Sequence, residues 1–139
     1  MNEDILTTEN IESTLLDIAE RNFVDVYFLN MKSSTPDVAI PRDNTVVMNP
    51  NFTTKVSLMY RFSHELSHVL YGDPDAQSVY YFSEYGKRGE ERLAHRNAIR
   101  MLMSIEMPTN VNTFMEYYRV PSWLEKDVDR TFRELVYLE

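Results

Sequence analysis

The sequence predicts an α+β fold, in which a small three-stranded sheet precedes a mainly helical body. Two observations predict it. The chain has only three glycines and six prolines in 139 residues, which indicates few tight turns and favours helices. Short extended segments are confined to residues 24–48, whereas apolar residues at helical spacing dominate after them. Residues 1–139 fit one domain, and the acidic, polar residues 1–9 are expected to be flexible.

The first elements are a helix and the three strands. A helix is predicted at residues 8–22, and its inward face carries Ile11, Leu15, Ile18 and Ala19. Strands are predicted at residues 24–28, 38–40 and 45–48, with residues 41–44 as a turn between the last two. The Asn49-Pro50-Asn51 segment ends the sheet.

A second helix follows the sheet. We expect it to begin at a cap, Thr53 or Thr54, and to run to about Tyr71. Its predicted buried stripe has apolar residues four apart, namely Leu58, Phe62, Leu66 and Leu70. The turn residues 72–75 end this helix.

The remaining chain is predicted to be helical. After a tyrosine-rich stretch at residues 80–85 and a loop at 86–89, a helix begins near Gly89 and passes Met103. Its apolar positions are Ala94, Ala98, Met101, Leu102 and Ile105. A short helix at residues 110–118 comes next. A last helix starts at Pro121-Ser122 and packs on the body through Trp123, Leu124, Val128, Phe132 and Leu135.

Composition excludes several classes of function. The 22 acidic and 14 basic residues give a net charge of −8, which repels a phosphate backbone, so we expect no direct contact with nucleic acid. Without cysteine the chain has no disulfide and no thiolate. No apolar run approaches the length of a membrane span, and the first residues do not resemble a signal peptide. A cytoplasmic protein is therefore expected.

The residues that indicate chemistry are His64-Glu65-Leu66-Ser67-His68, which lie within the second predicted helix. Residues four apart on a helix share a face, so both imidazoles can bind one zinc ion. Glu65 lies one step round the helix, where it is too far to be a third ligand. It is well placed as the general base that takes a proton from the attacking water. The alternative is a pair of surface histidines on an amphipathic helix.

A catalytic zinc site needs a third protein ligand. The candidates are Asp73, Asp75, Glu84, Glu90, Glu91 and His95. Glu91 shares a helical face with His95 and with the small residues Ala94 and Ala98, which allow another helix to approach. We therefore predict Glu91 as the third ligand. His95 is the second choice as ligand, and otherwise it lines the site as a neutral donor.

The two helices together resemble those of the ImmA/IrrE-like zinc metallopeptidases, which are often encoded by phages and integrative elements. The family has His-Glu-x-x-His on one helix and Glu-x-x-Ala-(Asn or His)-x-x-Ala on the next, and residues 91–103, ERLAHRNAIRMLM, are similar to the second pattern. Two positions depart from the family. Ser67 replaces a usual glycine, and Ser104 replaces a usual proline, with Pro108 one turn later. Aligning Pro108 instead would put His95 at the ligand position.

The resemblance implies a zincin-like metallopeptidase domain with Zn²⁺ held by His64, His68 and Glu91. It also implies site-specific cleavage of a protein partner, a helix-turn-helix repressor of a phage or mobile element. In this scheme Glu65 is the catalytic base and His95 supports the oxyanion. An exposed edge strand at residues 45–48 would hold the substrate by strand addition. Two rivals remain: a non-catalytic antirepressor that uses the zinc site structurally, and a zinc hydrolase acting on a non-peptide amide.

Overall fold

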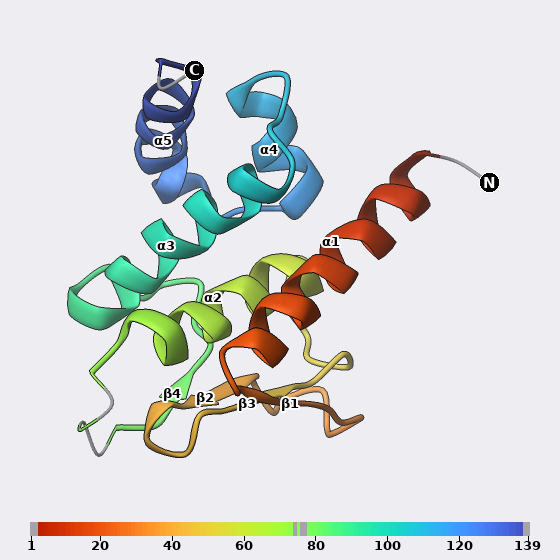
Figure 1. Ribbon diagram of the computed structural model, residues 1–139, viewed down its shortest axis with the longest axis vertical. Helices are drawn as coiled ribbons and strands as arrows, with labels where there is room; N and C mark the ends of the chain where they lie inside the picture. Colours follow the sequence, from red (N-terminus) through yellow and green to blue (C-terminus); the bar gives the residue numbers. More distant parts are fainter. Residues whose placement is uncertain (1–2, 74, 76–77, 138–139) are drawn as a thin grey trace.

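The fold is α+β, as predicted. The computed structural model describes residues 3–73, 75 and 78–137, with side chains from residue 7 onwards. Its elements are, in order, α1 (Glu3–Arg21), β1 (Asp25–Phe28), β2 (Val38–Ile40), η1 (Pro41–Asp43), β3 (Thr45–Met48), α2 (Leu58–Tyr71), β4 (Tyr80–Tyr81), α3 (Gly89–Ile105), α4 (Val111–Tyr118), η2 (Ser122–Leu124) and α5 (Glu125–Tyr137). Helix α2 lies between the sheet on one side and α3 on the other, and α4 and α5 lie beyond α3 (Figure 1).

The sheet differs from the prediction in strand number and order. It has four strands in the order β1-β3-β2-β4 among the described residues, not three. The additional strand β4 pairs antiparallel with β2 through Tyr80 and Tyr81, and a segment of two residues is too short to show a strand pattern. Strand β3 was expected at an edge, but it lies inside the sheet because β1 pairs with it in parallel and β2 in antiparallel. Strand addition at residues 45–48 is therefore excluded.

Three helices begin at other residues than predicted. Helix α5 begins at Glu125 and not at Pro121-Ser122, because the 3-10 turn η2 occupies Ser122–Leu124. Helix α1 begins at Glu3 and not near residue 8, while residues 1 and 2 of the segment expected to be flexible lie outside the described part. Helix α2 begins at Leu58, because Ser57 is its cap and accepts a hydrogen bond from the Tyr60 N–H at 3.2 Å. Thr54 instead accepts from the Val56 N–H at 3.2 Å, which stabilises a turn ahead of the helix.

Helix α2 is buried around its whole circumference from Met59 to His68. The predicted stripe is confirmed in part, since Phe62 and Leu66 are fully buried and the two end positions are partly buried against the core. The alternative of surface histidines on an amphipathic helix is wrong, because the sheet and α3 cover opposite sides of α2. Polar side chains of α2 consequently lie in the interior, where each needs a partner.

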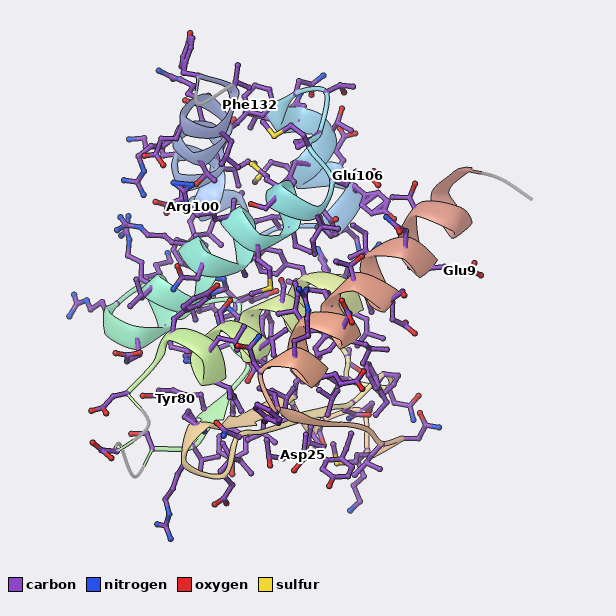
Figure 2. The ribbon with its side chains drawn as sticks, viewed as in Figure 1. Glu9, Asp25, Tyr80, Arg100, Glu106 and Phe132 are labelled. Carbon is purple, nitrogen blue, oxygen red and sulfur yellow. The ribbon has the colours of Figure 1, made fainter. Side chains whose placement is uncertain are left out.

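The last helix packs on the body, as expected. The carboxylate of Asp127, 4% exposed, accepts from Arg96 at 3.1 Å and Arg130 at 3.0 Å. Arg100, on the part of α3 next to α5 (Figure 2), is paired with Glu134 at 2.5 Å. The pairs Arg96–Asp127 and Arg100–Glu134 fix α5 against α3. None of the described helices combines the length and the apolar character that crossing a bilayer requires.

Candidate metal centre

The two motif histidines meet on one face of α2, as their spacing predicts. Their ring centroids are 5.0 Å apart, and the exposure of the His64 and His68 residues is 0% and 1%. Potential ligand atoms of His64, Glu65 and His68 all lie within 4.8 Å of one another. This cluster could hold a metal ion. The expectation that Glu65 lies too far away to be a ligand is therefore wrong.

Glu91, on α3, extends its carboxylate to His64 and His68. Its Oε1 lies 2.5 Å from Nε2 of His68, and its Oε2 lies 3.4 Å from Nε2 of His64. Gly86 permits this position of the side chain, because a Cβ there would lie only 2.8 Å from the Cβ of Glu91. The structure therefore brings together the three predicted ligands from two helices that pack on each other.

The polar atoms of the cluster fit a shared cation. Apart from the contacts of Glu91 with the two histidines, the ring nitrogens of His64 and His68 and the carboxylate oxygens of Glu65 and Glu91 are buried without a hydrogen-bond partner among the described residues. Buried polar atoms without partners are costly and rare in native proteins. Imidazole nitrogens and a carboxylate facing one point are a common ligand set for a divalent transition metal.

Electrostatics favour the ligand forms of these groups. Burial alone would raise the pKa of Glu91, but the imidazoles of His64 and His68 outweigh it and lower that pKa to about 2. Burial also lowers the pKa of His64, with the neighbouring Glu91 opposing that shift. The carboxylate is thus charged and the His64 imidazole neutral, which are the forms that bind a metal.

Glu65 lies beside the histidine ligands and is fully buried. Its Oε1 is 3.9 Å from Nε2 of His64. Its pKa is raised well above the usual range, first by burial and then by the charge of Glu91, while Arg61 acts in the opposite direction. Arg61 precedes Glu65 by one turn and forms a buried ion pair with Asp37 at 3.3 Å, and Asp37 also accepts from the Asn49 N–H at 2.7 Å.

His95 lies behind His64, with its side chain fully enclosed. It is 0% exposed, its ring centroid is 4.1 Å from that of His64, and its Nδ1 is 2.9 Å from Oη of the buried Tyr60. Burial, and then the repulsion that a protonated His95 would meet from a protonated His64, lower the pKa of His95 to about 2. The imidazole is therefore neutral. Because Glu91, not His95, faces both Nε2 atoms, the geometry favours Glu91 over the alternative ligand.

Aromatic rings enclose the histidines, and of these only Tyr80 was a candidate from the sequence, as one of four tyrosines between the two helices. The Tyr80 ring stacks on His68 with centroids 4.1 Å apart, and the Phe82 ring meets His64 edge-on at 5.3 Å. The position of Tyr60 could have been predicted from the sequence. Tyr60 precedes His64 by four residues and therefore lies on the same face of the helix. The other acidic candidates near the motif do not join the cluster, and Asp73 and Asp75 are exposed.

The fold and the site define an α+β chain with a His-Glu-His cluster and a second glutamate between two packed helices. Comparisons with family models, curated proteins and solved structures give no match.

Proposed function

We propose that this chain is a zinc-dependent endopeptidase in which His64, His68 and Glu91 hold the zinc. The observation that carries the proposal is the convergence of these three side chains, from two helices, with their buried nitrogen and oxygen atoms otherwise unpartnered. Two histidines and one carboxylate leave a fourth position for substrate or water, as catalytic zinc sites do. Glu91 is the least buried of the three, with a side chain 23% exposed, although its two carboxylate oxygens are themselves buried.

When bound, the zinc supplies Lewis acidity, which polarises a carbonyl and makes water more acidic. The other steps belong to the chain. An Oε atom of Glu65 takes the proton from the attacking water and then delivers it to the nitrogen of the leaving amine. Burial of Glu65 suits this task, because it raises the pKa of the carboxyl toward the range in which a group both accepts and releases a proton.

His95 is assigned to the tetrahedral oxyanion. Burial raises the pKa of Tyr60 well above 10, so the phenol stays protonated and can donate to Nδ1 of His95. The proton of the neutral imidazole then lies on Nε2. This nitrogen has no side-chain partner among the described residues, and the Ser83 backbone, whose hydrogen bond raises the His95 pKa against the effect of burial, is its competing acceptor. We assign it to the oxyanion as a donor.

The proposed substrate is a helix-turn-helix repressor of a phage or mobile element, encountered in the cytoplasm. This partner follows from the resemblance of residues 64–68 and 91–103 to the ImmA/IrrE-like peptidases. The net charge of −8 is compatible with it, since DNA-binding proteins present basic surfaces. No contact of the chain itself with nucleic acid is proposed.

A non-catalytic antirepressor, with the metal in a structural role, is the second candidate. The observation that favours it is the burial of His64, Glu65 and His68, none of which exceeds 1% exposure. A closed site of this kind would stabilise the fold without chemistry.

One experiment distinguishes the peptidase from the non-catalytic antirepressor. Wild-type chain and Glu65→Gln are each loaded with zinc and incubated with the repressor encoded beside them, and the products are analysed by mass spectrometry. The peptidase predicts discrete fragments with the wild type and a loss of rate of at least about 100-fold in the variant, the lower range for a general base. Repressor inactivation by both proteins without fragments would instead establish the antirepressor.

A further inference from the structure

A cavity of about 410 Å³ lies beside the metal centre. Three segments form it: the loop before α2, the loop after β4, and the link between α4 and η2. Its lining includes Lys55, Val56, Glu84, Tyr85, Arg119 and Trp123. The described contacts of these residues show where the cavity lies and which ligand it suits.

Trp123 joins the cavity to the metal centre. Its indole N–H donates to the Glu84 carbonyl at 2.7 Å, and its ring meets His95 edge-on at 5.3 Å. His95 in turn contacts His64. On the other side, the loop that carries Glu84 continues to Gly86, which packs against the ligand Glu91. The cavity therefore shares its wall with the proposed site of cleavage.

The cavity holds two cations that no carboxylate neutralises. Lys55 and Arg119 both line it, and among the residues that the structure describes neither forms an ion pair with an acid. The arginines of α3 and α5 differ, since Arg96 and Arg130 pair with an acidic neighbour. The Glu84 carboxylate has another partner, because it accepts a hydrogen bond from the Tyr85 phenol. This hydrogen bond raises the pKa of Tyr85.

The backbone at Arg119 is unusual for an arginine. Its φ of 52° lies in the left-handed region, where glycine is favoured after a helix. The N–H groups of Arg119 and Val120 close α4 by bonding to Glu116 at 3.3 Å and Met115 at 3.0 Å. The Arg119 Nε donates to the Lys55 backbone carbonyl at 2.5 Å, which holds the guanidinium against the segment that carries Lys55. An arginine thus occupies a backbone position at which glycine is the favoured residue.

We propose that this cavity binds an acidic side chain, aspartate or glutamate, of the peptide substrate close to the bond that is cleaved. The carboxylate pairs with Arg119 and Lys55, which are the specificity-determining residues, and the aliphatic stem packs on Val56 and Trp123. This assignment rests on the proposed peptidase function, but the cavity can be tested without cleavage.

The test is affinity selection of a randomised peptide library on immobilised, zinc-loaded Glu65→Gln. At one position Glu and Asp are expected to be enriched over Gln and Asn by about tenfold, the effect of a charged hydrogen bond. Arg119→Gly and Lys55→Gln should each remove most of this enrichment. Lys126→Gln, which removes a charge on α5 beside a different cavity, should leave it unchanged. Arg119→Gly suits the left-handed backbone, so its unfolding midpoint should stay close to that of the parent.

The results decide between distinct conclusions. Absence of acidic enrichment, or enrichment that survives in both Arg119→Gly and Lys55→Gln, overturns the assignment of the cavity. Digestion of the same library by the wild type tests the proposed function separately. Acidic selection without digestion would retain the cavity and refute the peptidase, whereas digestion without acidic preference would do the reverse.

Discussion

Acidification of the metal-free chain is expected to destabilise the fold through His95. An exposed imidazole has a pKa of about 6.5, whereas burial, and then His64, lower the pKa of His95 in the folded chain to about 2. The unfolded chain therefore binds a proton that the folded chain excludes. Stability is fully present above about pH 6.5 and decreases as the pH falls below it.

The size of the effect follows from linkage. Each pH unit below the unfolded pKa costs about 1.4 kcal/mol while the folded imidazole stays neutral. At about pH 5 the loss due to His95 is therefore about 2 kcal/mol. Glu91 acts in the same direction at lower pH, because its folded pKa of about 2 lies below the ordinary value of 4.5, so its contribution is lost as the pH falls through that window.

Urea unfolding of the metal-free chain at about pH 7 and about pH 5 measures this loss. Circular dichroism should be followed together with the fluorescence of Trp123, the single tryptophan, whose ring lies 5.3 Å from His95. The control is His95→Asn, in which a neutral amide replaces the titrating group. Its free energy of unfolding should fall by about 2 kcal/mol less between the two pH values. Equal losses in wild type and variant would refute the reasoning.

Two further substitutions test the supports of the site. Gly86→Ala places a methyl group 2.8 Å from the Cβ of Glu91, so the carboxylate must move and zinc affinity should fall by about 10- to 100-fold, as when a supporting residue is lost; unchanged affinity in a competition titration would show that Glu91 is no ligand. Asp37→Ala leaves Arg61 buried without its partner and should cost about 3–5 kcal/mol in urea unfolding. Arg133→Ala removes one side of an exposed pair and should cause little change, and equal costs for the two variants would contradict the role of burial.

The sequence predicted those parts of the fold that depend on local spacing. The histidine pair of α2 and the position of Glu91 on α3 follow from residues three, four and seven apart on a helix, and the structure brings these side chains together. The apolar faces of α1 and α3 were predicted for the same reason, and Ile11, Leu15 and Leu102 are fully buried.

Features that depend on packing between distant segments were not predicted. The position of β3 inside the sheet results from pairing with both β1 and β2, which no periodicity within β3 can indicate. The buried pair of Asp37 and Arg61 joins a loop to α2. From the sequence, each of these charged residues would be expected on the surface. The cap of α2 was assigned to the wrong residue because several hydroxyl side chains precede the helix, and only the backbone shows that Ser57 is the one that caps it.

The metal content of the purified chain tests the central claim most directly. Elemental analysis after dialysis against buffer with zinc should find about one zinc per chain in the wild type and in Glu65→Gln, because Glu65 is not a ligand in this account. His64→Ala, His68→Ala and Glu91→Ala should each retain far less zinc. A wild-type chain that binds no metal, or a Glu91→Ala variant that binds as much as the wild type, would contradict the proposed centre.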